Sequence, residues 1–133
     1  MSANSELGTR NSELAEQRPE KLLDRTKALA IRILKLVDAL PSKRSTDVIG
    51  KQLIRSATSV GANYRAAKRA RSTAEFCAKL GIVEEEADET SYWLELLAES
   101  GHVKAEKLSP LREEVNSVTA MIVRSIKTAR SRK

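Results

Sequence analysis

The stretch IRSATSVGANYRAAKRARSTAEF, residues 54–76, lies inside a longer segment, residues 45–101, that predicts two helices joined by a very short turn. Ser45, Thr46 and Asp47 supply three good N-cap residues in a row, which predicts that the first of these helices begins there. Apolar residues then recur every three or four positions, as one face of a helix requires. This stripe comprises Ile49, Leu53, Ala57, Val60, Tyr64 and Ala67.

The second helix of this pair begins almost without a loop. Ser72 is a good N-cap residue, and Glu75 three positions later completes a capping box. So short a connection requires the two helices to run antiparallel. Apolar residues of the second helix keep the alternating steps of four and three residues that define a heptad repeat. The repeat comprises Phe76, Leu80, Val83, Ala87, Thr90, Leu94, Leu97 and Gly101.

Two further helices are predicted on either side of this pair. Pro19 suits the first turn of a helix that ends before Pro41, and Ser109 with Pro110 forms an N-cap and first-turn pair. Four amphipathic helices with short connections predict an all-α, antiparallel, up-down-up-down four-helix bundle. We expect a disordered polar tail at 1–18 and a bundle at 19–130, with helices at about 20–40, 46–70, 73–100 and 109–130.

The composition of the 133-residue chain agrees with one small helical domain. Apolar residues make up 41% and aromatic residues only 3%, so we expect a core of Leu, Ile, Val and Ala. The single cysteine, Cys77, excludes an intrachain disulfide and a multi-cysteine metal site. No apolar run reaches the ~18 residues of a membrane span, and the first residues lack the apolar core of a signal peptide. A soluble cytoplasmic protein is therefore expected.

A second, polar stripe runs beside the apolar stripe of residues 46–70. It is either a solvent-exposed face or a buried seam whose groups hydrogen-bond across a helix contact. Gly50 and Gly61 favour the seam, because glycine inside a helix costs about 1 kcal/mol and usually marks close approach. Acidic residues of the following helix can reach it. The predicted polar seam comprises Gln52, Arg55, Ser56, Ser59, Asn63, Glu86 and Glu89.

Cations gather at the ends of two predicted helices, in a chain whose net charge is +6. In an antiparallel bundle the helices at 46–70 and 109–130 end at the same pole. Compensation of the helix dipole, worth about 0.3–1 kcal/mol per cation, accounts for two or three of these residues. Phosphate contact, pairing with the acidic helix of a neighbouring subunit, and plain solubility remain as alternatives for the rest. This basic pole comprises Arg65, Lys68, Arg69, Arg71, Arg124, Lys127, Arg130, Arg132 and Lys133.

Contact with the backbone of RNA or DNA, without strong sequence readout, is the leading hypothesis for the basic pole. Tyr64 is the only aromatic residue among these cations, so base stacking has weak support. The helix at 73–100 carries the opposite charge. Its acidic run comprises Glu84, Glu85, Glu86, Asp88 and Glu89.

No convergent set of catalytic groups is present, so we predict no enzyme, no cofactor and no metal site. His102 is the single histidine. Cys77 follows the heptad residue Phe76 and is more often a packing residue than a nucleophile. Glu99 and His102 have the Glu-x-x-His spacing of di-iron bundles, but those sites require the motif twice and two further carboxylates.

The motif IRSATSVGANY at 54–64, followed by Glu86, Glu89–Thr90 and Tyr92–Leu94, resembles the four-helix-bundle family of 23S ribosomal RNA intervening-sequence proteins. The resemblance implies a four-helix bundle that assembles as a ring-like homopentamer, with no established catalytic activity. Distant relatives in this resemblance include the accessory protein of diversity-generating retroelements. That protein is a basic pentamer that partners a reverse transcriptase and binds nucleic acid.

The resemblance covers most of residues 20–128 and is strongest between Gln52 and Leu97. Two positions depart from the family pattern: Ala66 stands where Glu is common, and Glu85 stands where Lys is common. The first change makes the end of its helix more basic, and the second makes the next helix more acidic. The motif positions that carry over are Arg55, Ser56, Ser59, Asn63, Glu86 and Glu89.

We therefore expect a self-associating bundle, a homopentamer, joined through the surplus apolar surface of its second and third helices. Ile82, Trp93 and Leu96 lie off the heptad stripe and supply part of that surface. The leading functional hypothesis is a non-catalytic accessory protein that binds RNA or DNA at the basic pole. The alternative is a protein–protein adaptor, for example a partner of a reverse transcriptase in a diversity-generating retroelement, whose acidic helix is the working surface.

Overall fold

The computed structural model describes residues 19–132, which form four α-helices with no strand among them. The predicted tail at 1–18 and the last residue lie outside the described residues. Within this part of the chain, no helix combines the length and the apolar character needed to cross a membrane. The helices are α2 (Pro19–Asp38), α3 (Arg44–Lys68), α4 (Thr73–Glu99) and α5 (Ala105–Ser131).

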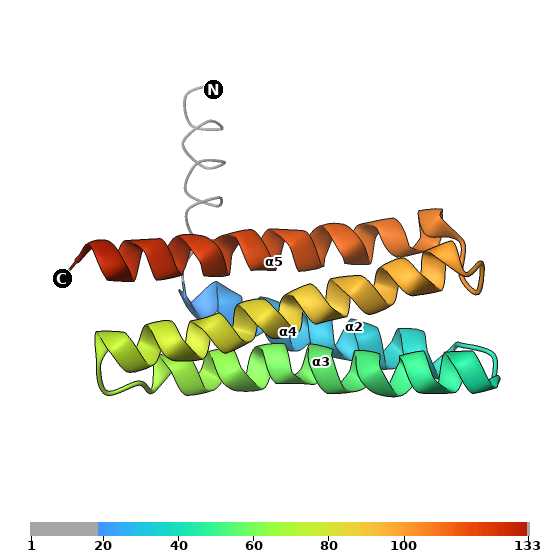
Figure 1. The fold of residues 1–133 in the computed structure, drawn as a ribbon, viewed down its shortest axis with the longest axis horizontal. Coiled ribbons are helices and arrows are strands. Elements are labelled where there is room, and N and C mark those ends of the chain that lie inside the picture. The colour runs from blue at the N-terminus through green and yellow to red at the C-terminus, as the bar shows by residue number, and fades with distance from the viewer. Residues whose placement is uncertain (1–18, 133) are drawn as a thin grey trace, which may run out of the picture.

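Successive helices run antiparallel along one long axis (Figure 1). Each helix packs against its neighbours in the chain, and α2 closes the bundle by meeting α5 over the smallest contact. The connections at 39–43, 69–72 and 100–104 are short, as sequential antiparallel packing requires. Ser72 Oγ accepts a hydrogen bond from the backbone N–H of Glu75 at 3.0 Å, so α4 begins where the capping pattern predicted. The predicted all-α bundle of four helices is confirmed.

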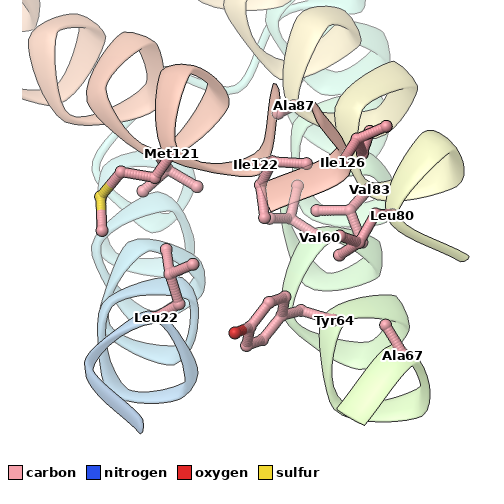
Figure 2. Packing of buried hydrophobic residues seen from close by; sticks show 11 residues of the cluster. Leu22, Val60, Tyr64, Ala67, Leu80, Val83, Ala87, Met121, Ile122 and Ile126 are labelled. Carbon is pink, nitrogen blue, oxygen red and sulfur yellow. The ribbon is translucent and has the colours of Figure 1, made fainter. Parts of the chain in front are cut away.

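One apolar face of every helix contributes to the core, which consists of two adjoining clusters. In one cluster, Val60 and Tyr64 of α3 and Ile122 of α5 point into the space between the helices (Figure 2). Phe76 is only partly buried and packs against the edge of this cluster. The central part of the predicted heptad repeat of α4 is confirmed, because its residues are all 0% exposed: Leu80, Val83, Ala87, Thr90, Leu94 and Leu97. Gly101, the last predicted position, is exposed and lies after the end of α4.

Two glycines let α2 and α3 approach each other closely. A Cβ atom at Gly50 would lie 2.9 Å from Cγ1 of Val37, and one at Gly61 would lie 3.4 Å from Oγ1 of Thr26. Both facing side chains belong to α2. The sequence analysis linked these glycines to the polar seam, and the structure differs, because the glycines lie at the contact of α3 with α2 rather than with α4.

The start of α3 also differs from the prediction. The helix begins at Arg44, with Lys43 as the N-cap residue, rather than within Ser45–Asp47. Thr46 lies in the first turn, where its Oγ1 accepts a hydrogen bond from the backbone N–H of Lys43 at 3.0 Å. The Thr46 hydroxyl therefore accepts the hydrogen bond of the N-cap residue from a position inside the helix. The three good N-cap residues at 45–47 thus did not mark the start of α3.

The start of α5 lies earlier than predicted. Gly101 adopts a left-handed conformation (φ +81°) just after α4, and α5 begins at Ala105 rather than at Ser109. The early start places Leu108 on the helix, where it is 1% exposed in the core. Pro110 therefore lies inside the helix, where its ring and its missing N–H disturb the hydrogen bond to the carbonyl four residues earlier. The Ser109–Pro110 pair therefore lies within the helix and did not mark its start.

Candidate nucleic-acid interface and polar seam

The predicted basic pole lies at one end of the bundle, where α3 and α5 both end (Figure 1). All eight of its described cations are exposed, and Lys133 lies outside the described residues. The antiparallel order brings together cations from two distant segments of the chain. They are Arg65, Lys68, Arg69, Arg71, Arg124, Lys127, Arg130 and Arg132.

These cations form no ion pair with any described residue, since the three ion pairs of the described chain involve other arginines. Arg65, Lys68 and Arg130 lie in the last turns of α3 and α5, where they compensate the helix dipoles. Arg71 follows α3 in the connection, and Arg124 lies well before the end of α5. The pole therefore carries more positive charge than compensation of the helix dipoles accounts for.

Two adjoining hollows open between these cations. The first, of about 450 Å³, lies between α4 and α5, and its lining includes Arg124, Arg132 and Phe76. The second, of about 380 Å³, lies where α3 turns into α4, and its lining includes Lys68, Arg71 and again Arg132 and Phe76. Because Phe76, Ala129 and Arg132 line both hollows, the hollows form one continuous basic surface.

Some predicted pole residues lie on other parts of the surface. Arg65 lines a separate hollow between α2 and α3, and Arg130 lines one beside Cys77. The cations that share the two adjoining hollows are therefore a smaller set. They are Lys68, Arg71, Arg124 and Arg132.

The aromatic residue at the pole is not the one that the sequence indicated. Tyr64 is 2% exposed, and its ring points from α3 into the core (Figure 2), so it cannot stack on a ligand. Phe76, assigned from the sequence to the heptad core, is partly buried and lines both hollows. The sequence feature that could have indicated the exposure of Phe76 is its position in the first turn of α4, close to the capping residue Ser72. Side chains at the end of a bundle are covered by fewer neighbours than those at its centre.

Among the described side chains, Asp24 near the start of α2 and Glu75 in the first turn of α4 are exposed acids at this end of the molecule. Neither forms an ion pair with a described cation. Among the residues that the structure describes, no acid lines either of the two adjoining hollows. The electrostatic potential over the hollows is therefore dominated by the cations.

Arg55 of α3 is the centre of the polar seam between α3 and α4. Its Nη1 donates to Oε2 of Glu86 at 3.2 Å, and its Nη2 donates to Oε1 of Glu89. Its Nε donates to Oε1 of Gln52 at 3.0 Å. Trp93 Nε1 donates to the same oxygen of Glu89 at 3.2 Å. The structure thus brings these four predicted seam residues together and adds Trp93, which the sequence analysis placed on a different surface.

A buried pair of hydroxyl groups lies beside Arg55. Thr90 Oγ1 lies 2.9 Å from Ser56 Oγ and 2.9 Å from the backbone oxygen of Glu86, so its single proton can be donated to either. Ser56 and Thr90 are both 0% exposed. Ser59 and Asn63 are only partly buried, and Asn63 Nδ2 donates to the backbone oxygen of Ser59 within α3. The hydrogen-bonded seam is therefore shorter than the spacing predicts, and Thr90 is its missing partner.

The hydrogen bond from Arg55 lowers the pKa of Glu89; partial burial opposes this change, and the Trp93 N–H and the positive charge of Arg55 reinforce it. The hydrogen bond to Glu89 in turn raises the pKa of Arg55. The side chains of Arg55 and Glu89 are 47% and 34% exposed, so solvent screens the pair and its contribution to stability is small. Its main effect is to neutralise charge within the chain.

A second ion pair joins α2 to α5. Arg25 Nη2 donates to Oε1 of Glu114 at 2.6 Å, and Arg25 Nε donates to Oε2 at 3.1 Å, which makes the pair bidentate. Ser117 Oγ accepts a further hydrogen bond from Nη2 at 3.0 Å. The two charged residues are 89 positions apart, so no local spacing indicated this contact.

The remaining candidate residues do not assemble a reactive centre in the described chain. His102 Nε2 lies 3.0 Å from Ser45 Oγ, which ties the connection before α5 to the start of α3. Among residues 19–132, no three His, Cys, Asp or Glu side chains gather as metal ligands. Glu99 and His102 therefore gain no third ligand there. Cys77 is half-buried at the hollow that Arg130 also lines.

Large apolar side chains are exposed on three helices. The sequence analysis placed surplus apolar surface on the second and third helices, and α3 and α4 contribute three such residues. The remaining two lie on α2 and were not predicted. The exposed residues are Ile31, Leu34, Val48, Ile82 and Tyr92.

Comparison with known proteins identifies the family. The family described as 23S rRNA-intervening sequence protein matches residues 20–124. The crystal structure of a protein with unknown function from the S23 ribosomal protein family of Bacteroides thetaiotaomicron is 35% identical in sequence, with a TM-score of 0.77. The match covers 82% of this chain and 97% of that chain. No curated protein matches. This chain therefore belongs to the family of 23S rRNA-intervening sequence proteins.

Proposed function

We propose that this protein is a non-catalytic accessory protein that binds the phosphate backbone of RNA or DNA at its basic pole. The observation that carries the proposal is the convergence of four cations on two adjoining hollows, where none of them pairs with a described acid. These cations are Lys68, Arg71, Arg124 and Arg132. Unpaired cations neutralise phosphates and release counterions, which makes binding favourable at low salt. The absence of acids from the lining of the two hollows supports the same conclusion.

Contacts to phosphate position a protein on nucleic acid but carry no sequence information. We therefore expect weak sequence preference and strong dependence on salt. Binding of labelled RNA and duplex DNA across a salt series tests this, with the mass of the protein measured in the same buffers. The logarithm of the association constant should fall with the logarithm of salt concentration by about 0.9 for each phosphate neutralised on a duplex.

Two variants of equal charge locate the binding surface. The pole variant replaces four cations around the hollows with glutamine, and it should lower the salt slope by roughly 3 to 4 units. The far-end variant replaces four exposed cations at the opposite end, and it should retain the slope. An unchanged slope in the pole variant would remove the proposal. The substitutions are Lys68→Gln, Arg71→Gln, Arg124→Gln and Arg132→Gln for the pole variant, and Arg44→Gln, Lys51→Gln, Lys104→Gln and Lys107→Gln for the far-end variant.

Self-association is part of the proposal, in the form of the homopentamer that the family resemblance implies. Exposed apolar side chains support it, since Ile31, Leu34 and Tyr92 are 45%, 39% and 52% exposed in the single chain. Ile31 and Leu34 lie three positions apart on α2 and so share one face, and exposed apolar groups that gather on a face are typical of contacts between proteins. Native mass spectrometry should find five copies of the 14.7 kDa chain. A monomer under the conditions of nucleic-acid binding would contradict the proposed assembly.

A protein–protein adaptor is the second candidate function, and the outer surface of α4 favours it. Ile82 and Tyr92 are exposed there with the acidic residues Glu85 and Asp88, so apolar and charged groups lie on one surface. A reverse transcriptase is the partner that the resemblance implies. Co-purification with a co-expressed reverse transcriptase should be lost in the variant Glu85→Lys with Asp88→Lys and kept in the far-end variant. Retention by both variants would rule out this surface.

A further inference from the structure

Phe76 borders both basic hollows. It lies in the first turn of α4, where one side of its ring packs against the core cluster that contains Leu80 and Ile126. It is the only aromatic residue among the lining residues of either. An apolar ring is thus presented to a surface that also carries four cations.

The groups around this ring are of two kinds. Arg132 borders both hollows, Arg124 borders the first, and Lys68 with Arg71 borders the second. Residues with hydroxyl groups also line the two hollows. They are Ser72, Thr73, Ser125 and Thr128.

The combination of an aromatic ring with cations suits single-stranded nucleic acid better than a duplex. A duplex presents phosphates to a protein surface but keeps the faces of its bases stacked inside the helix, so Phe76 would gain nothing from it. A single strand exposes base faces, and stacking on an aromatic side chain contributes on the order of 1–3 kcal/mol per base. Both hollows, at about 450 and 380 Å³, lie within the usual size range of small-molecule sites, roughly 300–1,000 Å³.

We infer that the basic pole binds single-stranded nucleic acid, with an unpaired base against the ring of Phe76 and the flanking phosphates on Arg71 and Arg132. The inference rests on the proposed function, because it names the form of nucleic acid that the same pole binds. Lys68 and Arg124 extend the track of phosphate contacts on either side of the ring. Sequence preference remains weak, since every base has a face that can stack.

The experiment compares labelled oligo(U), oligo(dT) and a duplex of equal length, about 12 nucleotides, by fluorescence anisotropy. The wild-type protein should bind both single strands at least about tenfold more tightly than the duplex. Phe76→Leu keeps an apolar side chain against the core but removes the ring. It should weaken binding of the single strands by between about 5-fold and 150-fold and leave duplex binding unchanged.

Two further variants separate stacking from structural damage. Phe76→Trp retains an aromatic ring and should keep the preference for single strands. The far-end variant changes only residues outside both hollows and keeps Phe76, so it should also keep the preference for single strands. Circular dichroism and the urea midpoint of each variant show that the bundle is folded.

The possible results test the preference for single strands separately from phosphate binding at the basic pole. Salt-dependent binding that is equal for duplex and single strands, and unchanged in Phe76→Leu, would overturn the single-strand inference and leave the phosphate-binding pole intact. No binding to any of the three probes at low salt would remove both. A preference for single strands that Phe76→Leu abolishes establishes the stacking contact, and the ratio of oligo(U) to oligo(dT) affinity then shows whether the sugar is recognised.

Discussion

Arg55 and Arg71 carry the same guanidinium group in opposite circumstances. Arg55 lies in the seam between α3 and α4, where two carboxylates and an amide oxygen accept its hydrogen bonds. Arg71 lies at the edge of a hollow at the pole and has no ionic partner in the described chain. The seam uses charge to join two helices of one chain. The pole leaves charge available for a molecule outside it.

This difference shows that a count of cations does not tell which of them form ion pairs within the chain. The acidic run of α4 supplies Glu86 and Glu89 to Arg55, so part of its charge is consumed inside the bundle. The pole has Asp24 and Glu75 nearby, yet neither pairs with a described cation. Whether a charged side chain forms an ion pair within the chain therefore indicates its role better than the sign of its charge does. A paired side chain joins helices, and an unpaired one is available to a ligand.

The largest effect is expected when the available charge is removed. In the pole variant, four phosphate contacts are lost, and affinity for nucleic acid at 0.1 M salt should fall on the order of a thousandfold. The free energy of unfolding, measured by urea denaturation, should stay within about 0.5 kcal/mol of the wild-type value, because these exposed side chains pair with no described residue. A large loss of stability in this variant would mean that the pole is structural.

Glycine substitutions test where the stability of the bundle does lie. Gly50→Ala should lower the free energy of unfolding, because the new Cβ would lie 2.9 Å from Cγ1 of Val37, a residue with little rotamer freedom in a helix. The overpacking, about 1–3 kcal/mol, outweighs a gain in helix propensity of about 1 kcal/mol.

Gly81→Ala is the matched control for this substitution. Nothing lies within 4 Å of its new Cβ, so only the gain in helix propensity remains, and the free energy of unfolding should rise. Urea denaturation of both variants gives the comparison. Shifts of the same sign and size would show that α2 and α3 are not closely packed at Gly50.

The buried hydroxyl pair should have an intermediate effect. Thr90→Val leaves Ser56 with only the backbone oxygen of Leu53, at 3.4 Å, and should cost about 1–2 kcal/mol of unfolding free energy. The double variant with Ser56→Ala removes both partners and should cost less than the sum of the single changes. A double-mutant cycle by urea denaturation measures the coupling, and strictly additive values would show that the pair does not interact.

The smallest effect belongs to the exposed ion pair of the seam. Because Arg55 lowers the pKa of Glu89 in the folded chain, the contribution of Glu89 to stability is complete above the pKa of an unfolded glutamate, about 4.3. It is lost as the pH falls through the lower folded pKa. The free energy of unfolding, measured by urea denaturation between pH 5 and pH 3, should therefore fall less steeply with falling pH in Glu89→Gln than in the wild type. Glu85→Gln, exposed on the same helix, should behave as the wild type does.

The sequence predicted those features of the fold that depend on local periodicity. The repeat from Leu80 to Leu97 located the buried face of α4, and Ser72 located its start. The start of α5 was missed, because Ser109 and Pro110 have the pattern of an N-cap and first turn, whereas the helix begins at Ala105 and contains both. Spacing could not show whether Gly50 faces α2 or α4, since both are neighbours of α3.

The candidate sites divide in the same way. Antiparallel order was enough to place the cations of α3 and α5 at one end. The exposure of individual aromatic rings was not predictable, because Tyr64 and Phe76 both lie on apolar stripes and only packing decides that one is buried and the other borders a hollow. Thr90 was counted with the apolar residues, although a threonine on that stripe can accept a buried partner such as Ser56.

The small contact between α2 and α5 bears on how the molecule opens. At 20 residues, α2 is shorter than the other three helices, which have 25, 27 and 27, and it meets α5 over less surface than any other neighbouring pair. Undocking of α2 would break fewer contacts than separation of α3 from α4, and cooperative units of low stability exchange their amide hydrogens first. Hydrogen exchange should therefore be fastest in α2 and slowest in α4. Protection of α2 equal to that of α4 would show that the bundle opens only as a whole.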